Sequence, residues 1–305
     1  MEYVRIGTRG SKLALWQTNF IASELKNKYP DLKIEIINIK TTGDKILDSP
    51  LSKIGGKGLF TKELELQMLQ GKIDLAVHSL KDVPAQLQPE FTITAITKRA
   101  DPFDAFISNK YQSFEELPQG AVIGTSSLRR RAQLLAIRPD LQIENLRGNV
   151  DTRLRKLDEG TFDAIILAAA GLKRLGYESR ITEILQPSIM LPAVGQGALA
   201  IETLTDNVET REILTFLDDP ATRAATTAER AFLRVVEGGC QVPVGVHATI
   251  EDNKIITEAI IASTDGQKFV RDKIIGKINN AERLGESLAK HLLEIGGQSI
   301  LEHII

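Results

Sequence analysis

The sequence has little of what disulfide-bonded and metal-binding proteins need. Its 305 residues include a single cysteine, Cys240, so the chain can form neither an intrachain disulfide nor a cysteine-based zinc site. None of its four histidines lies four residues from another, so the paired spacing of a helical metal site is absent. We therefore expect no bound metal.

The sequence also lacks an excess of charge of one sign. Its 38 Lys and Arg residues face 40 Asp and Glu residues, which gives a formal net charge of −2, and only 5% of residues are aromatic. Overall attraction to nucleic acid or to an anionic membrane needs more positive charge, and base stacking needs more aromatic rings. We expect neither partner, so any anion recognition must come from local clusters.

No long hydrophobic run is present. The longest, residues 164–172, is too short to cross a bilayer. The first five residues include the acid Glu2 and do not lead into the apolar segment of a secretory signal. We expect a cytoplasmic protein of about two domains from the chain length.

Two parts of the chain resemble each other in the order of their predicted elements. In each, a short apolar strand, a Gly-Thr turn, an amphipathic helix and a Pro-Asp-Leu segment lead into a second and then a third strand. The matched segments are 4–32 with 121–141, 33–39 with 142–146, and 75–77 with 164–167. This near-repeat predicts two similar lobes.

Alternating strands and amphipathic helices predict βαβ units and a mainly parallel sheet in each lobe. In the first helix, Leu13, Trp16, Phe20 and Leu25 lie near one face and are predicted to cover the sheet. Ligands of such sheets gather where strands end and helices begin, so the two lobes are expected to present their loops to a shared cleft.

The last 85 or so residues have a different pattern. Residues 252–253 and 265–266 have hairpin-turn composition between three predicted strands, and a helix lies on either side of the strands. The predicted elements are a helix at 221–237, strands at 244–250, 254–263 and 268–274, and a helix at 280–294. This segment predicts a small α+β domain with an antiparallel sheet.

Basic and hydroxyl residues follow several predicted strands. Thr125 to Arg131 contains three consecutive arginines at a helix start, Arg147 and Arg153 follow the next strand, and Arg9 and Ser11 occupy the matching loop of the first lobe. Three consecutive arginines alone are typical of a solvated helix face. Three such loops at strand ends favour a site for a ligand with several negative charges.

His78 to Pro84 follows the predicted strand at 75–77 and contains Asp82. A carboxylate there can move a proton or stabilise a developing cation, but an aspartate before proline also closes turns. Both interpretations stay open from the residues alone. For His78, a packed or hydrogen-bonded side chain is favoured over a catalytic base.

Two glycine motifs and the lone cysteine need separate interpretation. Gly55–Gly58 lacks the preceding strand and the Ser/Thr of a phosphate loop, and Gly195–Ala200 precedes a strand-like segment where a dinucleotide site needs a helix. Both are interpreted as tight turns near the cleft.

Cys240 follows two glycines in a loop and is either a small buried apolar residue or a reachable covalent attachment point.

Taken together, the motifs resemble the porphobilinogen deaminase family, also called hydroxymethylbilane synthases, over nearly the whole chain. The motifs that carry the resemblance are Arg5–Ala14, Thr41–Asp44, Gly55–Phe60, His78–Pro84, Gly124–Arg130, Leu146–Asn149, Leu191–Ala198 and Glu237–Val244.

The resemblance implies an α/β fold with two lobes like those of type II periplasmic binding proteins, with mainly parallel sheets. It adds a small C-terminal α+β domain with a three-stranded antiparallel sheet. The implied domains are domain 1 at 1–97 and 198–217, domain 2 at 98–197, and domain 3 at 218–305.

The resemblance also implies a transferase of tetrapyrrole biosynthesis, the route to porphyrins and heme, and a monomer. Such an enzyme condenses four molecules of its small-molecule substrate, porphobilinogen, with release of ammonia, into 1-hydroxymethylbilane. It does so on a dipyrromethane cofactor held by a thioether, here to Cys240.

By the same resemblance Asp82 is catalytic. The residues implied to bind cofactor and substrate are Arg9, Ser11, Lys57, Ser79, Lys81, Thr125, Ser127, Arg129, Arg130, Arg147, Gly148, Arg153, Arg174 and Gln196. Asp151 lies beside this set and is expected to point away from it. A solute-binding module and a nucleic-acid binder are the alternatives; the missing signal segment disfavours the first, and the charge balance disfavours the second.

Overall fold

The computed structural model describes residues 1–45, 58–236 and 242–303. The chain divides into two compact units. Unit 1 contains the described residues up to Ala100 together with Gly197–Arg223, and unit 2 contains Asp101–Gln196 together with the described residues from Ala224 onward. The chain therefore passes from unit 1 to unit 2, back to unit 1, and again to unit 2.

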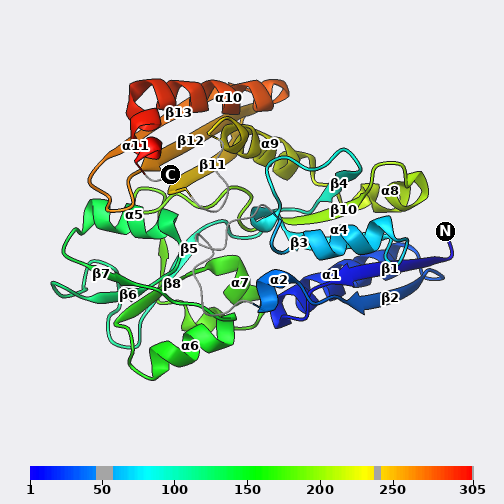
Figure 1. Ribbon diagram of the computed structural model, residues 1–305, viewed down its shortest axis with the longest axis horizontal. Helices are drawn as coiled ribbons and strands as arrows, with labels where there is room; N and C mark the ends of the chain where they lie inside the picture. The colour runs from blue at the N-terminus through cyan, green and yellow to red at the C-terminus, as the bar shows by residue number, and fades with distance from the viewer. Residues whose placement is uncertain (46–57, 237–241, 304–305) are drawn as a thin grey trace. The chain divides into compact units, whose positions relative to one another are not determined.

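Unit 1 is built on a five-stranded sheet in the order β2-β1-β3-β10-β4 (Figure 1). The strands are β1 (Tyr3–Thr8), β2 (Lys33–Asn38), β3 (Leu75–Ser79), β4 (Phe91–Ile96) and β10 (Leu199–Leu204). β1 runs parallel to β2 and β3, whereas β10 runs antiparallel to β3 and β4. The reversed strand, β10, is the one that joins after the chain has passed through unit 2.

The helices of unit 1 connect and cover these strands. They are α1 (Lys12–Lys28), α2 (Thr42–Lys45), α4 (Lys62–Leu69), η1 (Leu80–Asp82), α8 (Val208–Leu214) and η3 (Thr215–Leu217), and α9 (Pro220–Val235) begins in this unit. Val4 and Ile6 of β1 and Ile21 and Leu25 of α1 belong to one buried cluster. α1 is thus held on the sheet by apolar burial.

The prediction for the buried face of α1 is wrong for its aromatic residues. Ala14, Ile21 and Leu25 are buried, while Trp16 and Phe20 are each 39% exposed and stack on each other. Residues 14, 21 and 25 follow the helical period toward the sheet, so the large rings fall about a third of a turn or more away. The smaller residues of α1 therefore cover the sheet, and its two large rings stack on the opposite side.

Unit 2 contains a second five-stranded sheet, in the order β7-β6-β8-β5-β9. The strands are β5 (Asp104–Ile107), β6 (Val122–Gly124), β7 (Gln142–Glu144), β8 (Ala164–Ala168) and β9 (Glu183–Leu185). β6 is parallel to β7 and β8, and β5 is antiparallel to β8 and β9. The reversed strand again arrives from the other unit, so the predicted repeat of two α/β lobes is confirmed in strand order.

Short helices follow the strands of this second sheet. They are α5 (Leu128–Ile137), α6 (Val150–Asp158), α7 (Ala169–Arg174) and η2 (Glu178–Arg180). Leu134 of α5 packs with Ile123 and Ile166 in one buried cluster, and Leu154 of α6 packs with Ile165 in another. The two faces of the sheet are therefore both covered, as a doubly wound sheet requires.

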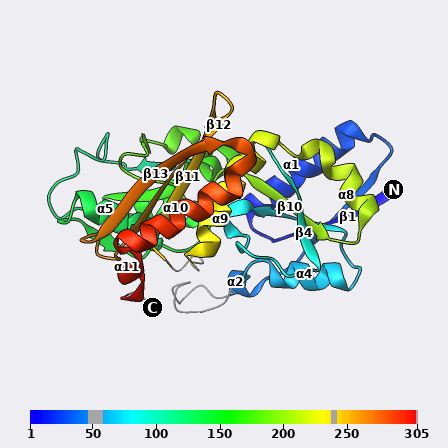
Figure 2. The same ribbon diagram turned by 90° about the horizontal axis from the view of Figure 1, so that it is seen from above.

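The predicted C-terminal antiparallel sheet is confirmed, in the order β11-β12-β13. Its elements are β11 (Val244–Glu251), β12 (Lys254–Ala262), β13 (Phe269–Lys277), η4 (Ile278–Asn280), α10 (Ala281–Leu292), the π-helical turn η5 (Leu293–Gly297) and α11 (Gln298–Glu302). Asp252 and Asn253 both have positive φ, as a two-residue hairpin turn needs. α10 lies across this sheet (Figure 2).

The hairpin between β12 and β13 packs against α5 within unit 2. Arg131 donates from Nε to the carbonyl oxygen of Thr264, at 3.1 Å. Gly266 has a φ of 73°, and a Cβ there would lie 2.4 Å from the backbone nitrogen of Ala136. The third arginine of the basic run, Arg131, thus makes a structural contact.

Among the described residues, no helix combines the length and apolar character of a membrane span.

Candidate functional site

In unit 1, the predicted site residues lie where two neighbouring strands end. Arg9 and Ser11 follow β1, and Ser79, Lys81 and Asp82 lie at and just after the end of β3. β1 and β3 are adjacent and parallel, so both segments emerge at the same edge of the sheet. The structure therefore brings these five predicted residues to one edge.

Asp82 is the last residue of η1, the single turn that follows β3. The backbone of this turn is held by a hydrogen bond from the Leu80 amide to the carbonyl oxygen of Ala198, at 3.0 Å. The Asp82 side chain is half-buried, and its carboxylate has no hydrogen-bond or ion-pair partner among the described residues. A fixed, unpaired carboxylate is suited to meet a cation or an N–H donor.

Ser79 and Arg9 each have a neighbour that sequence reasoning missed. Gln17 of α1 is buried and donates from Nε2 to the Ser79 hydroxyl, at 2.9 Å. The guanidinium of Arg9 lies over the ring of Phe60, 4.0 Å from the ring centre. This cation–π contact orients Arg9 at the edge where Asp82 lies. Phe60, the aromatic residue directly after the Gly-Lys-Gly-Leu motif, is the sequence feature that could have predicted this contact.

His78 is buried at 5% exposure and lies 2.9 Å from Oε2 of Glu202 through its Nε2 atom. The prediction of a hydrogen-bonded histidine is confirmed. Glu202 is fully buried on β10, and Glu65 of α4 is nearby; burial raises the pKa of Glu65, with the Glu202 charge as a further cause. Glu202 could have been noticed as an acid inside an apolar strand.

In unit 2, Thr125 and Ser127 occupy the loop from β6 into α5, and Arg129 and Arg130 lie at the start of that helix. The Ser127 hydroxyl caps α5 by accepting from the amide of Arg130, and the amide of Ser127 donates to the Thr125 hydroxyl, at 3.2 Å. Both hydroxyls are thereby used to fix the helix start. The two arginines extend from the first turn of that helix.

Arg129 and Arg130 are directed into the lobe, where each is 6% exposed. Arg129 Nη1 and Arg130 Nη2 each lie 2.7 Å from a carboxylate oxygen of Asp104, which is fully buried. Arg130 also donates from Nη1 to the Ile166 carbonyl oxygen, at 2.8 Å. The sequence predicted ligand contacts for both arginines, and the structure adds an internal counter-ion that was not predicted.

Asp104 holds this cluster together. Burial alone would raise its pKa, but the charges of Arg129 and Arg130 hold the pKa of that carboxyl well below its usual range. Gln196 donates from Nε2 to Asp104 at 3.1 Å and to the Pro102 carbonyl oxygen at 2.7 Å. One carboxylate between two guanidinium groups leaves one net positive charge.

The remaining basic residues of unit 2 follow β7 and end α7. Gly148 has a φ of 110°, and its carbonyl oxygen accepts from Nε of Arg153 at 2.8 Å. The Nη1 atom of Arg147 is buried without a hydrogen-bond partner among the described residues. Burial lowers the pKa of Arg174 to about 10. Asp151 accepts a hydrogen bond from the Tyr177 hydroxyl at 2.9 Å.

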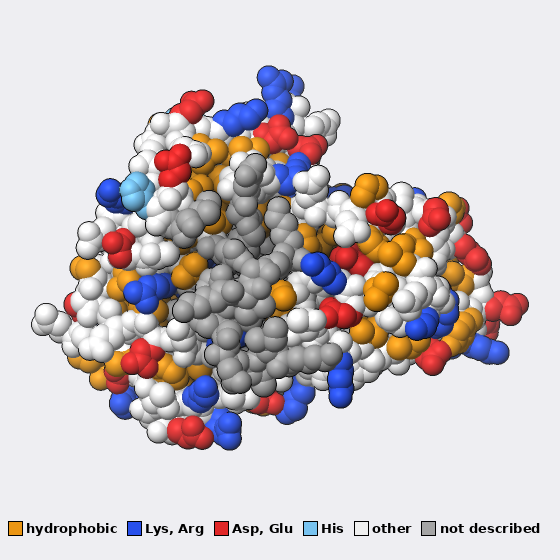
Figure 3. Space-filling view, viewed as in Figure 1, with side chains coloured by type: hydrophobic (Ala, Val, Ile, Leu, Met, Phe, Trp, Pro, Cys, Tyr) orange, Lys and Arg blue, Asp and Glu red, His pale blue; other side chains and the backbone are white. Residues whose placement is uncertain are grey.

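Two predicted site residues, Lys57 and Cys240, lie outside the described residues. The segment after Gly197 forms the strand β10, which confirms that it is not the helix of a dinucleotide site. No group of three metal-binding side chains is found within residues 1–45, 58–236 and 242–303. The face shown in Figure 3 mixes acidic and basic side chains without a large block of one sign.

Fold and site define a class: an α/β protein of two repeated lobes with basic strand-end loops and an acid, Asp82, that has no partner among the described residues, suited to a substrate with several carboxylates. Residues 4–212 match the family "Porphobilinogen deaminase, dipyromethane cofactor binding domain", and residues 224–294 match "Porphobilinogen deaminase, C-terminal domain". This chain belongs to the porphobilinogen deaminase family.

Full-length relatives agree. The chain is 54% identical to a porphobilinogen deaminase of Trichlorobacter lovleyi, over 99% of this chain and 96% of that one. It is 52% identical to that of Geobacter sulfurreducens, over 100% and 95%. The predicted transferase of tetrapyrrole biosynthesis, with its dipyrromethane cofactor, is confirmed by these matches.

Among solved structures, the methionine binding protein MetQ aligns with 78% of this chain and 96% of its own. The TM-score is 0.46 and the sequence identity is 15%. The strand orders described above, not this alignment, define the fold.

Proposed function

We propose that this protein joins four porphobilinogen molecules head to tail, releases ammonia and delivers 1-hydroxymethylbilane. The observation that carries the proposal is the half-buried Asp82 carboxylate, which has no partner among the described residues and shares a sheet edge with Arg9. A reaction that passes through a cation needs a fixed negative charge of this kind.

Asp82 acts on the substrate in this proposal. Loss of the aminomethyl nitrogen as ammonia leaves positive charge on the methylene carbon and its pyrrole ring. The carboxylate of Asp82 stabilises that charge and accepts a hydrogen bond from the pyrrole N–H. An asparagine could still accept the hydrogen bond but would not supply the charge.

The arginines of unit 2 fit a cofactor that carries acetate and propionate arms. Nη1 of Arg147 is buried without an acceptor among the described residues, and Arg174 is desolvated enough that its pKa falls to about 10. A carboxylate beside either group would compensate for lost hydration. Together with Arg153 they hold the carboxylate arms. When bound, the dipyrromethane supplies the attacking pyrrole carbon, and Cys240 is its proposed anchor.

Arg129 and Arg130 have different parts in this proposal. Arg130 engages Nε, Nη1 and Nη2 with Asp104 and the Ile166 carbonyl. Arg129 uses only Nη1, toward Asp104 and the Leu191 carbonyl, and its Nε and Nη2 atoms have no partner among the described residues. Arg129 therefore binds a ligand carboxylate, and Arg130 positions the cluster.

Other assignments carried by the resemblance belong to the same proposal. Ser11 and Ser127 are helix caps that also present a hydroxyl to the ligand, as does Thr125, while Lys57 and Lys81 add positive charge. Ser79, Gly148 and Gln196 complete the proposed binding set. The three-domain division, a monomeric state and a cytoplasmic location are parts of the proposal as well.

The test combines mass spectrometry with turnover. The intact wild-type chain should weigh more than its sequence by one dipyrromethane and give a pyrrole colour reaction, and Cys240→Ser should lose both. A wild-type mass equal to that of the sequence would instead favour a solute-binding module, which needs no covalent group.

Asp82→Asn should keep the added mass but lower porphobilinogen turnover about 100-fold or more, since one charge-stabilising group in an active site supplies that much. Asp31→Asn, an exposed aspartate of the same unit, is the matched control and should keep normal turnover. Near-normal ammonia release by Asp82→Asn would remove this residue from the mechanism.

A further inference from the structure

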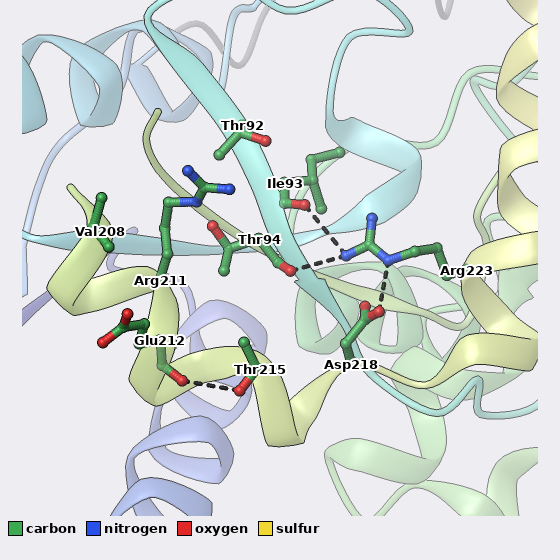
Figure 4. A pocket seen from close by; sticks show the side chains of 9 residues that line it. All are labelled: Thr92, Ile93, Thr94, Val208, Arg211, Glu212, Thr215, Asp218 and Arg223. Atoms are coloured by element: carbon green, nitrogen blue, oxygen red, sulfur yellow. Dashed lines mark hydrogen bonds and ion pairs between the residues drawn. The ribbon is translucent and has the colours of Figure 1, made fainter. Parts of the chain in front are cut away.

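A cavity of about 450 Å³ lies in unit 1 beside β4, the edge strand of its sheet (Figure 4). Its walls come from β4, from α8 with the turn that follows, and from the start of α9. None of its lining residues belongs to the candidate site described above, so its polar groups have no part in the proposed reaction.

Two arginines line this cavity, and one of them is neutralised. Arg223 donates from Nε to Asp218 at 2.7 Å and from Nη2 to the carbonyl oxygen of Thr94 at 2.9 Å, as Figure 4 shows. Arg223 and Asp218 therefore form an ion pair that also closes the outer edge of β4. This pair contributes no net charge to the cavity.

Arg211 is the other arginine, and its guanidinium is incompletely satisfied. Nη1 donates to the Thr205 carbonyl oxygen at 2.8 Å. Nε is buried with no hydrogen-bond partner, and Nη2 has none either among the described residues. A buried donor without an acceptor costs about 1–3 kcal/mol, so this side of the guanidinium favours any ligand that brings one.

The groups around Arg211 suit an oxyanion. Thr92 offers a hydroxyl with no partner among the described residues, and the Thr94 hydroxyl is 2.7 Å from that of Thr203. Arg211 extends toward the two β4 threonines in Figure 4. Glu212, the remaining acid of the wall, is exposed, and its carboxylate points away from them in the same view.

We propose that this cavity is a binding site for a small oxyanion, a carboxylate or a phosphate, held by Arg211 and Thr92. A planar guanidinium edge binds two oxygens of such a group at once, and a threonine hydroxyl donates to a third position or to the same oxygen. The half-exposed Arg211 side chain can turn its Nε and Nη2 edge into the cavity on binding.

The test follows the Arg211 Nε–H resonance in the ¹⁵N spectrum of the full chain, assigned by its loss in Arg211→Gln. Sodium acetate or sodium phosphate should shift it saturably, and sodium chloride at equal ionic strength should not. The tighter of the two ligands identifies the source as a carboxylate or a phosphate. No shift, or an equal shift with chloride, would overturn the site.

Two further variants serve as a second test of the site and as a control for the titration. Thr92→Val keeps the guanidinium and should weaken the same titration about tenfold, the effect of losing one hydrogen bond to a charged ligand; unchanged affinity would also overturn the site. Arg155→Gln removes an exposed arginine whose ion pair among the described residues is with Glu159, and should leave the titration as in the wild type.

Discussion

The two five-stranded sheets share one strand order and gather functional side chains where their strands end, but the groups there that lack partners among the described residues differ in charge. In unit 1 the residue of interest is an acid, Asp82, which no described residue neutralises. In unit 2 the acid Asp104 is fully buried between two arginines, and the nitrogens that lack partners among the described residues, on Arg129 and Arg147, belong to cations. Asp82 follows β3, whereas Arg129 follows β6 and Arg147 follows β7, so the repeated scaffold carries unpartnered groups of opposite charge at different strand ends.

This difference shows that topology fixes where functional side chains gather but not their charge. The repeat predicted the positions of both loop sets correctly. Which loop holds an unpaired charge depends on whether a neighbouring strand supplies a counter-ion, as β5 does through Asp104. Variants that remove or add such a partner therefore probe the comparison directly.

The largest stability effect is expected for Asp104→Asn. This change leaves the buried Arg129 and Arg130 facing each other without a counter-charge, and breaking a buried ion pair on one side costs about 3–5 kcal/mol in free energy of unfolding. Urea denaturation measures it. Asp158→Asn, which removes an exposed partner of Arg180 in the same unit, is the matched control and should cost no more than about 1 kcal/mol. Similar costs for the two variants would contradict the cluster's role.

The stabilising contribution of Asp104 should also depend on pH. Arg129 and Arg130 hold its pKa below the unfolded value despite burial, so the folded protein binds this proton more weakly than the unfolded chain. Its contribution is therefore fully present above the unfolded carboxyl pKa of about 4 and is lost as the pH falls toward the lower folded pKa. The stability difference between wild type and Asp104→Asn should shrink on acidification below about pH 4.

Most of the fold could be predicted because each element carries its own local signal. The turn at Asp252 and Asn253, the strands on either side of it and the helix from Lys12 to Lys28 all follow from periodicity and turn composition. The wrongly assigned face of that helix shows the limit. Trp16 and Phe20 are large and apolar, yet the direction of the sheet decides which stripe is buried.

The sequence predicted where the candidate site residues lie in the fold, but not which residues they contact. Arg129 and Arg130 were recognised as members of a basic run at a strand end. Their partner, Asp104, lies about 25 positions earlier, on β5, the first strand after the chain leaves unit 1. Its contact with the arginines arises only in the tertiary structure. A sequence shows that an arginine is present, not which of its nitrogens are already used.

A smaller effect on stability should distinguish Arg129 from Arg130. Arg130→Lys loses one of the two hydrogen bonds to Oδ1 of Asp104 and the bond to the Ile166 carbonyl, so it should lower the free energy of unfolding by about 1–3 kcal/mol. Arg129→Lys keeps one donor near Asp104 and should lower it less, while weakening porphobilinogen binding more. Urea denaturation and the substrate concentration at half-maximal rate measure the two effects. The reverse order in both measurements would exchange the roles assigned to these residues.

The smallest effect concerns Glu65, a buried acid of unit 1. The pH dependence of its contribution to stability has the opposite sign to that of Asp104. Burial raises the pKa of Glu65, so the folded protein binds this proton more tightly than the unfolded chain does, and stability is lost as the pH rises through the folded pKa. Glu65→Gln removes this loss. Relative to the wild type, the variant should therefore become more stable between pH 4 and pH 8 in urea denaturation, whereas the exposed Glu90→Gln should show no such trend. A difference that stays flat with pH would mean that protonation of Glu65 is not linked to folding, and would contradict the opposite sign assigned to the two acids.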